Sequence, residues 1–233
     1  MATYYVDGVD GNDLNAGTSE GSGNAWATID KAMNTVAAGD HVYIKGNGDY
    51  TETATIDTVG TQTASIIFEG YTSTPGDGGM ATIDATGLSN GVTYSVSPYL
   101  YYVFRNITVK NANSYGWSLS ACRLMAFENC QANNNAGWGF NLSGYAVFME
   151  WEAKDNTANG GFRCIDHGRL IGCKIMRNSG IWVLLSSSSS FLALCLSVSF
   201  SSFSFYFRLR PFSITTYLDG DAHTTPGRFA LHR

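Results

Sequence analysis

Short apolar runs, each ended by glycine, asparagine, aspartate or threonine, cover the first half of the chain. Side chains alternate between the two sides of a strand, so short runs of this kind predict β-strands. We expect strands at residues 42–44, 54–56, 66–68, 81–83 and 92–96. One stretch has helical spacing instead, and it predicts a short amphipathic helix over about residues 27–37, with its apolar side formed by Ile29, Ala32, Met33 and Val36.

From residue 103 onward the chain repeats itself, with a period of about 22 residues that lies in the range of repeat proteins. Four similar segments begin at Phe104, Phe127, Phe148 and Leu170. Each unit closes with a glycine followed by apolar residues, at Gly116, Gly137, Gly161 and Gly180. A nearly fixed period of this length predicts a solenoid in which each repeat forms one coil.

Within each unit the inward positions change parity once, which a straight strand cannot do. In the first unit the expected inward residues are Phe104, Ile107 and Val109. The parity change falls, unit by unit, at Asn106, Asn129, Glu150 and Gly172. Asparagine and glycine tolerate the left-handed backbone of a tight corner, and only Glu150 departs from this pattern. We therefore predict coils of short strands joined by corners and stacked about 4.8 Å apart.

These units, together with the N-terminal segments 4–8, 26–29, 38–40, 42–44 and 49–52, resemble the right-handed parallel β-helix proteins of the pectate-lyase-like superfamily. The resemblance covers about residues 3–184. It implies an all-β fold, a right-handed single-stranded parallel β-helix of about 22 residues per coil with a short N-terminal capping helix. It also implies polysaccharide as the partner and an extracellular or virion-associated location.

We expect three parts in the chain: an N-terminal loop and capping helix (1–40), the parallel β-helix (41–184) and an atypical Ser/Phe/Leu-rich tail (185–233). Residues 186–204 hold ten serines, no charge occurs between Arg177 and Arg208, and none of the 17 asparagines follows Asn178. Three interpretations stay open for the tail. It is a membrane span, which ten serines argue against; an end cap or oligomerisation segment at the open end of the β-helix; or non-native sequence from a frameshift or truncation, which we favour.

Composition excludes several function classes. Only 14% of the residues are charged, the net charge is -5, and Lys and Arg do not cluster, which argues against a nucleic-acid partner. The 44% of hydrophobic residues argues against a disordered chain. Five cysteines without a CxxC pair predict buried thiols rather than a zinc site. The first residues lack the basic and apolar regions of a signal peptide, so none is expected.

In enzymes of the superfamily, reactive side chains point outward from one sheet on successive coils. The strand after each glycine is the candidate for that sheet, and its expected outward residues are Ser118, Gly139, Arg163 and Trp182. Hydrolysis of a glycosidic bond normally needs two carboxylates, and this row holds none. Lyase chemistry needs a base next to a uronate carboxylate that is neutralised by a cation or calcium.

The candidate catalytic residues are Arg163 as the base, with Asp155 and Asp166 in flanking turns. A guanidinium holds its proton strongly, so this role needs an unusual environment. The alternative is that Arg163 is a solvated residue paired with a turn aspartate. Trp182 is the candidate for stacking on a sugar ring, whereas Trp117, Trp138 and Phe162 are expected to form an inward aromatic stack.

Residues 4–25 are expected to form a polar loop that carries a candidate calcium site. Its oxygen ligands would come from Asp7, Asp10, Asn12 and Asp13. Their spacing is not that of a complete calcium loop, and turn capping by the same side chains is the alternative. Calcium is the one cofactor that the sequence suggests.

Two function hypotheses remain, besides the possibility of an incomplete gene product without a function of its own. The first is a carbohydrate-interacting β-helix with a binding or structural role, as on a surface or a phage appendage, supported by the missing carboxylate pair and the Asn/Ser/Thr-rich faces. The second is a polysaccharide lyase acting on uronate-containing glycans, with a glycoside hydrolase as the weaker variant. Whether the chain is an enzyme stays open at this point, and calcium dependence would distinguish the two hypotheses.

Overall fold

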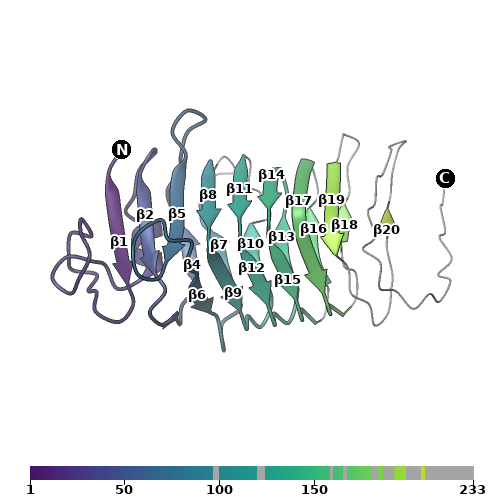
Figure 1. Cartoon of the computed structure of the whole chain (residues 1–233), viewed down its shortest axis with the longest axis horizontal. Coiled ribbons are helices and arrows are strands. Elements are labelled where there is room, and N and C mark those ends of the chain that lie inside the picture. Colours follow the sequence, from purple (N-terminus) through teal and green to yellow (C-terminus); the bar gives the residue numbers. More distant parts are fainter. Residues whose placement is uncertain are drawn as a thin grey trace.

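The computed structural model describes residues 1–96, 100–119, 124–157, 160–164, 167–179, 183–185, 192–197 and 206–207. Within these residues the chain forms a parallel β-solenoid whose strands stack along the long axis in Figure 1. Each strand pairs in parallel with its counterpart one coil away, as β8 (Tyr102–Arg105) pairs with β11 (Met125–Glu128). The predicted all-β solenoid is confirmed.

From β2 (His41–Lys45) onward the chain visits three faces in a fixed order, whereas the first coil passes from β1 (Thr3–Asp7) to β2 through a loop and a short helix. Besides β8 and β11, the first face contains β1, β2, β5 (Ile66–Tyr71), β14 (Tyr145–Met149), the start of β17 (His167–Met176) and β19 (Leu192–Ser197). The second contains β3 (Asp49–Tyr50), β6 (Ala81–Asp84), β9 (Ile107–Lys110), β12 (Gln131–Asn133), β15 (Glu152–Lys154) and the end of β17. The third contains β4 (Ala54–Ile56), β7 (Asn90–Tyr94), β10 (Tyr115–Leu119), β13 (Trp138–Leu142), β16 (Gly160–Cys164), β18 (Val183–Leu185) and β20 (Tyr206–Phe207).

The N-terminal strands correct one expectation. The five strands expected between residues 42 and 96 are present as β2, β4, β5, β6 and β7. The prediction of a loop over residues 4–25 is wrong at its start, because β1 already pairs with β2. The rest of that loop covers the outer edge of β1: the Tyr5 N–H donates to the Gly17 carbonyl, and the Trp26 N–H donates to the Tyr5 carbonyl. This covers a strand edge that would otherwise be open.

The predicted helix is present but shorter than residues 27–37. Helix α1 (Ile29–Met33) begins after Thr28, whose hydroxyl accepts the Lys31 N–H, and ends at Asn34. The carboxylate of Glu52 accepts the first two helical N–H groups, each at 2.9 Å. The β-branched Thr35 and Val36, which follow Asn34, favour helix weakly. The helix packs on β1 and β4, the first strands of two faces, as a cap over the N-terminal coils would.

The corners between the first and second faces lie where the parity change predicted them. Asn106, Asn129, Glu150 and Gly172 have φ angles of 54°, 50°, 53° and 62°. All four therefore adopt the left-handed region, including Glu150, which has neither the short amide of asparagine nor the freedom of glycine. A second set of left-handed corners ends the second face, at Asn111, Asn134, Asp155 and Arg177.

Aromatic rings fill the core as stacks that follow the coil axis. Phe127 lies between Phe104 and Phe148, with ring centroids 5.5 and 4.6 Å away. From the third face, Trp117 and Phe140 stack with an interplanar angle of 5°, and their centroids lie 5.9 Å apart. These rings are fully buried, which makes them a large part of the hydrophobic stabilisation of the coils.

A ladder of buried asparagines follows the second set of corners. Asn135, Asn156 and Asn178 lie one coil apart and are nearly inaccessible to solvent. The Asn156 side chain accepts the Asn135 backbone N–H at 3.0 Å and donates to the Ala132 carbonyl at 2.9 Å and to Asn178 Oδ1 at 2.8 Å. Each amide thus supplies hydrogen-bond partners to backbone groups at the corner. Without these partners, the buried backbone groups would destabilise the fold.

Two short strands of the predicted tail continue the stack. β19 pairs with β17, and β20 pairs with β18. Apart from these strands and Leu185, the tail lies outside the described residues. In the part of the chain that the structure describes, no helix is long and apolar enough to cross a membrane.

Candidate carbohydrate-binding face

A row of polar side chains runs along the outside of the third face. Thr55 pairs in register with Thr93, and Ser118 pairs with Asn141, which pairs with Arg163. Thr93 directly follows Val92, the partner of Trp117, so the two parts of the row are continuous. The neighbours on either side of Ser118 and Asn141 are buried core residues, so this row points away from the core, although Asn141 is itself only 5% exposed.

This register corrects two expectations. Gly139 does not share the row of Ser118 and Arg163; the residue at that place is Asn141. Likewise, the inward neighbour of Trp117 and Phe162 is Phe140, whereas Trp138 pairs with Gly160. The glycine–tryptophan similarity of the two units had aligned Trp117 with Trp138, which lies two residues before the observed partner Phe140 on β13.

The sequence does contain the signal that gives the correct register. Asn111 and Asn134 occupy equivalent corners, and Trp117 and Phe140 each follow their corner by the same number of positions. Counting from the corner therefore identifies Asn141 as an outward residue, because a corner fixes where the next strand can begin.

Arg163 lies at the end of the described row and is half-buried. Its Nη1 donates to Asn141 Oδ1 at 3.1 Å. Among the described residues, no carboxylate forms an ion pair with Arg163, so the alternative pairing with a turn aspartate is not seen with Asp155. In register with Arg163 on the next coil lies Leu184. The proposed sugar-stacking residue Trp182 lies outside the described residues.

Asp155 has a different partner. It lies at a left-handed corner after β15, where the Arg177 guanidinium of the next coil donates to Oδ1 at 2.8 Å and to Oδ2 at 2.7 Å. These hydrogen bonds lower the pKa of Asp155, so it stays ionised at neutral pH. It makes no contact with Arg163 within the described part of the chain. Asp166, the third candidate catalytic residue, lies outside that part.

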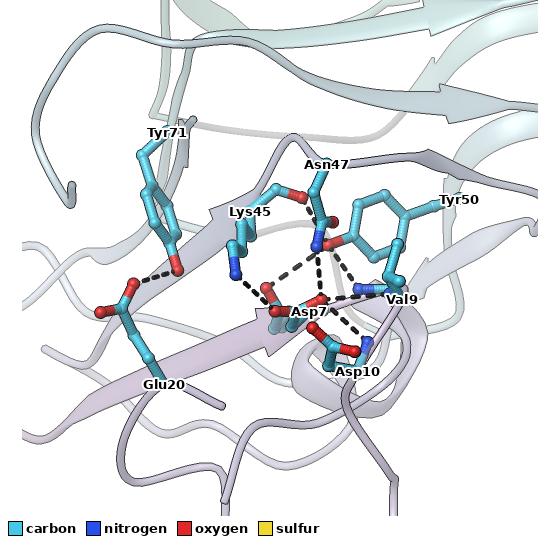
Figure 2. A network of polar contacts seen from close by, with 10 residues as sticks. Asp7, Val9, Asp10, Glu20, Lys45, Asn47, Tyr50 and Tyr71 are labelled. Carbon is cyan, nitrogen blue, oxygen red and sulfur yellow. Dashed lines mark hydrogen bonds and ion pairs between the residues drawn. The ribbon is translucent and has the colours of Figure 1, made fainter. Parts of the chain in front are cut away.

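In the candidate calcium loop, the oxygens of Asp7 already have partners (Figure 2). Asp7 Oδ2 accepts Lys45 Nζ at 2.9 Å, and Oδ1 accepts Asn47 Nδ2 at 2.7 Å and two backbone N–H groups at 3.1 Å. Burial raises the pKa of Asp7, but these hydrogen bonds outweigh burial and hold it at about 2.

The remaining loop residues have local roles or none. Asp13 accepts the N–H groups of Ala27 and Thr28 and the Thr28 hydroxyl, Asn12 Oδ1 accepts the Leu14 N–H, and Asp10 is exposed. Across the described residues, no three His, Cys, Asp or Glu side chains gather as a metal site would require. The contacts favour turn capping, and calcium binding stays a prediction.

Residues 4–167 match the family described as Pel9A-like, right handed beta helix region. The chain belongs to the Pel9A-like β-helix family. Because the β-helix of this family is right-handed, the solenoid is right-handed, as predicted. The matched region includes Thr55, Thr93, Ser118, Asn141 and Arg163. No curated protein matches the chain.

Solved structures share the Pel9A-like fold. The crystal structure of pectate lyase Pel9A is 21% identical with a TM-score of 0.68, over 85% of this chain and 53% of that protein. A rhamnogalacturonan lyase is 16% identical with a TM-score of 0.54, over 84% of this chain and 66% of that protein. Identities this low establish the fold alone. The chain spans about half the length of the pectate lyase that it matches.

Proposed function

We propose that the chain binds a polysaccharide along the third face, and that the polysaccharide contains uronate residues. The observation that carries this proposal is the outward row that ends in Arg163. The row offers the hydroxyl groups of Thr55, Thr93 and Ser118, which both donate to and accept from sugar hydroxyls, whereas Asn141 is buried and positions Arg163. Its one charged side chain is a cation without a carboxylate partner among the described residues.

A guanidinium in this setting favours an acidic ligand. Its planar fork matches the geometry of a carboxylate, and two parallel N–H···O bonds add both strength and orientation. Asn141 holds Nη1 at 3.1 Å and thereby restricts the guanidinium in the free protein. A side chain that is already positioned loses less conformational entropy when the ligand binds.

Polysaccharide lyase activity is the second candidate. It is supported by the likeness to two lyases, whose printed names concern pectate and rhamnogalacturonan. In such a reaction a base takes the proton on the carbon next to the uronate carboxylate. The electrons of that C–H bond form a carbon–carbon double bond, and the glycosidic oxygen leaves with the electrons of the C–O bond and is protonated. Arg163 would be the base, with Asp155 and Asp166 nearby in the sequence.

The contacts of the described residues favour binding over this reaction. The carboxylate of Asp155 is bound bidentately by Arg177, so it is not available as a calcium ligand without breaking that pair. Arg163 contacts a neutral amide rather than a group that would accept its proton, and a protonated guanidinium is a binding group rather than a base.

The test uses the full chain with polygalacturonate, first with calcium and then with chelator. Binding is measured by affinity electrophoresis, and lyase action by the absorbance of new unsaturated ends. We expect binding that Arg163→Ala weakens about tenfold, as loss of one charge-assisted contact implies. Arg177→Ala is the matched control, because it removes an exposed arginine that lies outside the row.

The outcomes separate the two candidates. Equal binding by wild type and Arg163→Ala contradicts the proposal. Unsaturated product that depends on calcium and disappears in Arg163→Ala would establish the lyase instead.

A further inference from the structure

The first face carries a second ordered surface, away from the row that ends in Arg163. Its strands from β1 to β14 lie side by side in Figure 1. One set of outward residues, here called the polar row, lies in register on successive coils and consists of Tyr5, Tyr43, Glu69, Arg105 and Glu128. A neighbouring set, the apolar row, lies two positions earlier on β5, β8, β11 and β14 and consists of Ile67, Val103, Ala126 and Val147. The adjoining positions on β2 and β17 are His41 and Arg169.

Both rows face away from the core. The residues between them on β5, β8 and β11, which are Phe68, Phe104 and Phe127, have no exposed surface. Because side chains alternate along a strand, the two rows must point to the opposite side. Val147 is 38% exposed, so the apolar row is in contact with solvent.

The polar row is held in place by its own contacts. The Tyr5 and Tyr43 rings stack with centroids 5.9 Å apart, and the His41 ring lies 4.1 Å from the Tyr43 ring. His41 Nε2 lies 3.1 Å from Glu69 Oε2, and Arg105 Nη1 lies 3.8 Å from the same oxygen. Arg105 Nε also donates to Glu128. The side chains are therefore ordered before any ligand arrives, which reduces the entropy lost on binding.

The charges on this surface differ from those on the third face. Glu69 and Glu128 contribute two negative charges, and Arg105 contributes one positive charge that both carboxylates already contact. Burial lowers the pKa of His41, although Glu69 opposes the shift, so the imidazole is neutral at pH 7. At the N-terminal end of the surface, Lys45 is paired with Asp7. From β1 to β14 this surface has no cation without a carboxylate partner, so that stretch disfavours a uronate chain; on the next coil, Arg169 of β17 lies in register with Val147.

We propose that the two rows of the first face form a second glycan-binding site, and that it takes a neutral polysaccharide lying along the coil axis. A pyranose ring has apolar C–H faces and hydroxyl edges. The apolar row contacts the ring faces, and the polar row contacts the hydroxyl groups. Glu69 and Glu128 accept hydrogen bonds, and Arg105 donates them. In the described part of the chain the Tyr5 and Tyr43 hydroxyls have no protein partner, so they are available to sugar hydroxyls.

This inference does not depend on the function proposed for the third face. The two sites lie on different faces of the coils and differ in charge, so they select different glycans. Variants of one site therefore serve as controls for the other.

The test measures retardation of the full chain in native gels containing soluble xylan, glucomannan or polygalacturonate. Wild type is compared with Tyr43→Ala, Val147→Glu and Arg163→Ala. Val147→Glu is the decisive variant, because it changes an exposed residue that the fold does not need and places a carboxylate among the apolar contacts. We expect Tyr43→Ala and Val147→Glu each to weaken binding of a neutral polysaccharide about tenfold. Arg163→Ala should leave that binding unchanged.

Three results would overturn the inference. One is a folded wild-type chain that neither neutral polysaccharide retards. Another is Val147→Glu binding the neutral polysaccharide as tightly as wild type does. The last is an equal loss of neutral-polysaccharide binding in Arg163→Ala, which would mean that a single site on the third face binds every glycan. Circular dichroism of each variant shows whether the fold is retained.

Discussion

At the scale of single residues, Asp7 shows how a charge is kept inside the first coil. Its side chain is only 2% exposed, and an isolated carboxylate would be costly at that depth. Lys45, Asn47 and two backbone N–H groups surround it, and they join the end of β1 to the end of β2 (Figure 2). In the acidic loop that suggested calcium, Lys45 thus neutralises the Asp7 carboxylate, and Asn47 and two backbone N–H groups donate hydrogen bonds to it.

This arrangement predicts that the free energy of unfolding depends on pH. The pKa of Asp7 falls from 3.8 to about 2 on folding, so ionised Asp7 stabilises the fold above about pH 4 by about 2 kcal/mol. That contribution is lost as the pH falls through 2. We expect Asp7→Asn to lower the free energy of unfolding by about this amount at pH 7, and the difference from wild type to shrink toward zero near pH 2. Urea unfolding across this range measures it.

The neighbouring Asp10→Asn is the control for this prediction, because Asp10 is exposed and its side chain accepts none of these bonds. A difference between wild type and Asp7→Asn that stays constant from pH 7 to pH 2 would show that packing rather than charge accounts for the loss.

At the scale of elements, the corners are the feature that made much of the fold predictable from the sequence. A parity change in the apolar pattern located four corners, and the structure confirms each of them. The pattern was sufficient because inward packing leaves only one register for each strand. The third face was harder, because Gly116–Trp117 and Gly137–Trp138 look equivalent although they follow their corners at different distances, and matching them displaced the row along β13. Asn141, the partner of Arg163, was missed for that reason.

Other features gave no periodic signal. The first strand, β1, was mistaken for part of a loop because its single alternating run is followed at once by polar residues. The polar row of the first face combines residues from five coils. Its members become neighbours only when the coils stack, so distances along the sequence do not reveal the set.

The corner at Glu150 yields a prediction about stability. Its φ of 53° strains a glutamate, whereas asparagine tolerates this region, and Asn106 and Asn129 occupy the equivalent corners. Asn129 Nδ2 also donates to Asn106 Oδ1 at 2.9 Å. In Glu150→Asn the new amide can repeat that bond on the next coil. We expect the variant to be more stable by about 1 kcal/mol, measured as a higher midpoint in thermal unfolding.

Glu152→Asn tests whether the stability gained in Glu150→Asn comes from the left-handed corner. Glu152 lies two residues further, within β15, where asparagine is disfavoured. That variant should be no more stable than wild type. If Glu150→Asn also fails to raise the midpoint, the left-handed corner does not strain the glutamate.

At the scale of the whole molecule, the solenoid is a linear array in which each coil contacts only its neighbours. Stability in such arrays is a sum of the stability of each repeat and of the interfaces between adjacent repeats. A defect in one coil should therefore weaken the coils beside it more than distant ones. The Phe127 side chain is a suitable place for such a defect, because it is fully buried and its ring packs against Phe104 on one side and Phe148 on the other.

We expect Phe127→Ala to lower the stability of its own coil by about 3–5 kcal/mol, because the variant loses packing contacts and leaves a cavity. Hydrogen exchange of the folded full chain, followed by mass spectrometry, should then be faster in β8, β11 and β14 and nearly unchanged in β1 and β2. Val147→Ala, on the outside of the same stack, should leave all five strands near wild-type rates, since its side chain is exposed. Acceleration of equal size in β1 and β14 would mean instead that the coils unfold as one cooperative unit. In that case the N-terminal loop, α1 and the Asp7 network would be coupled to the polar and apolar rows along the entire stack, because opening any coil would open them all.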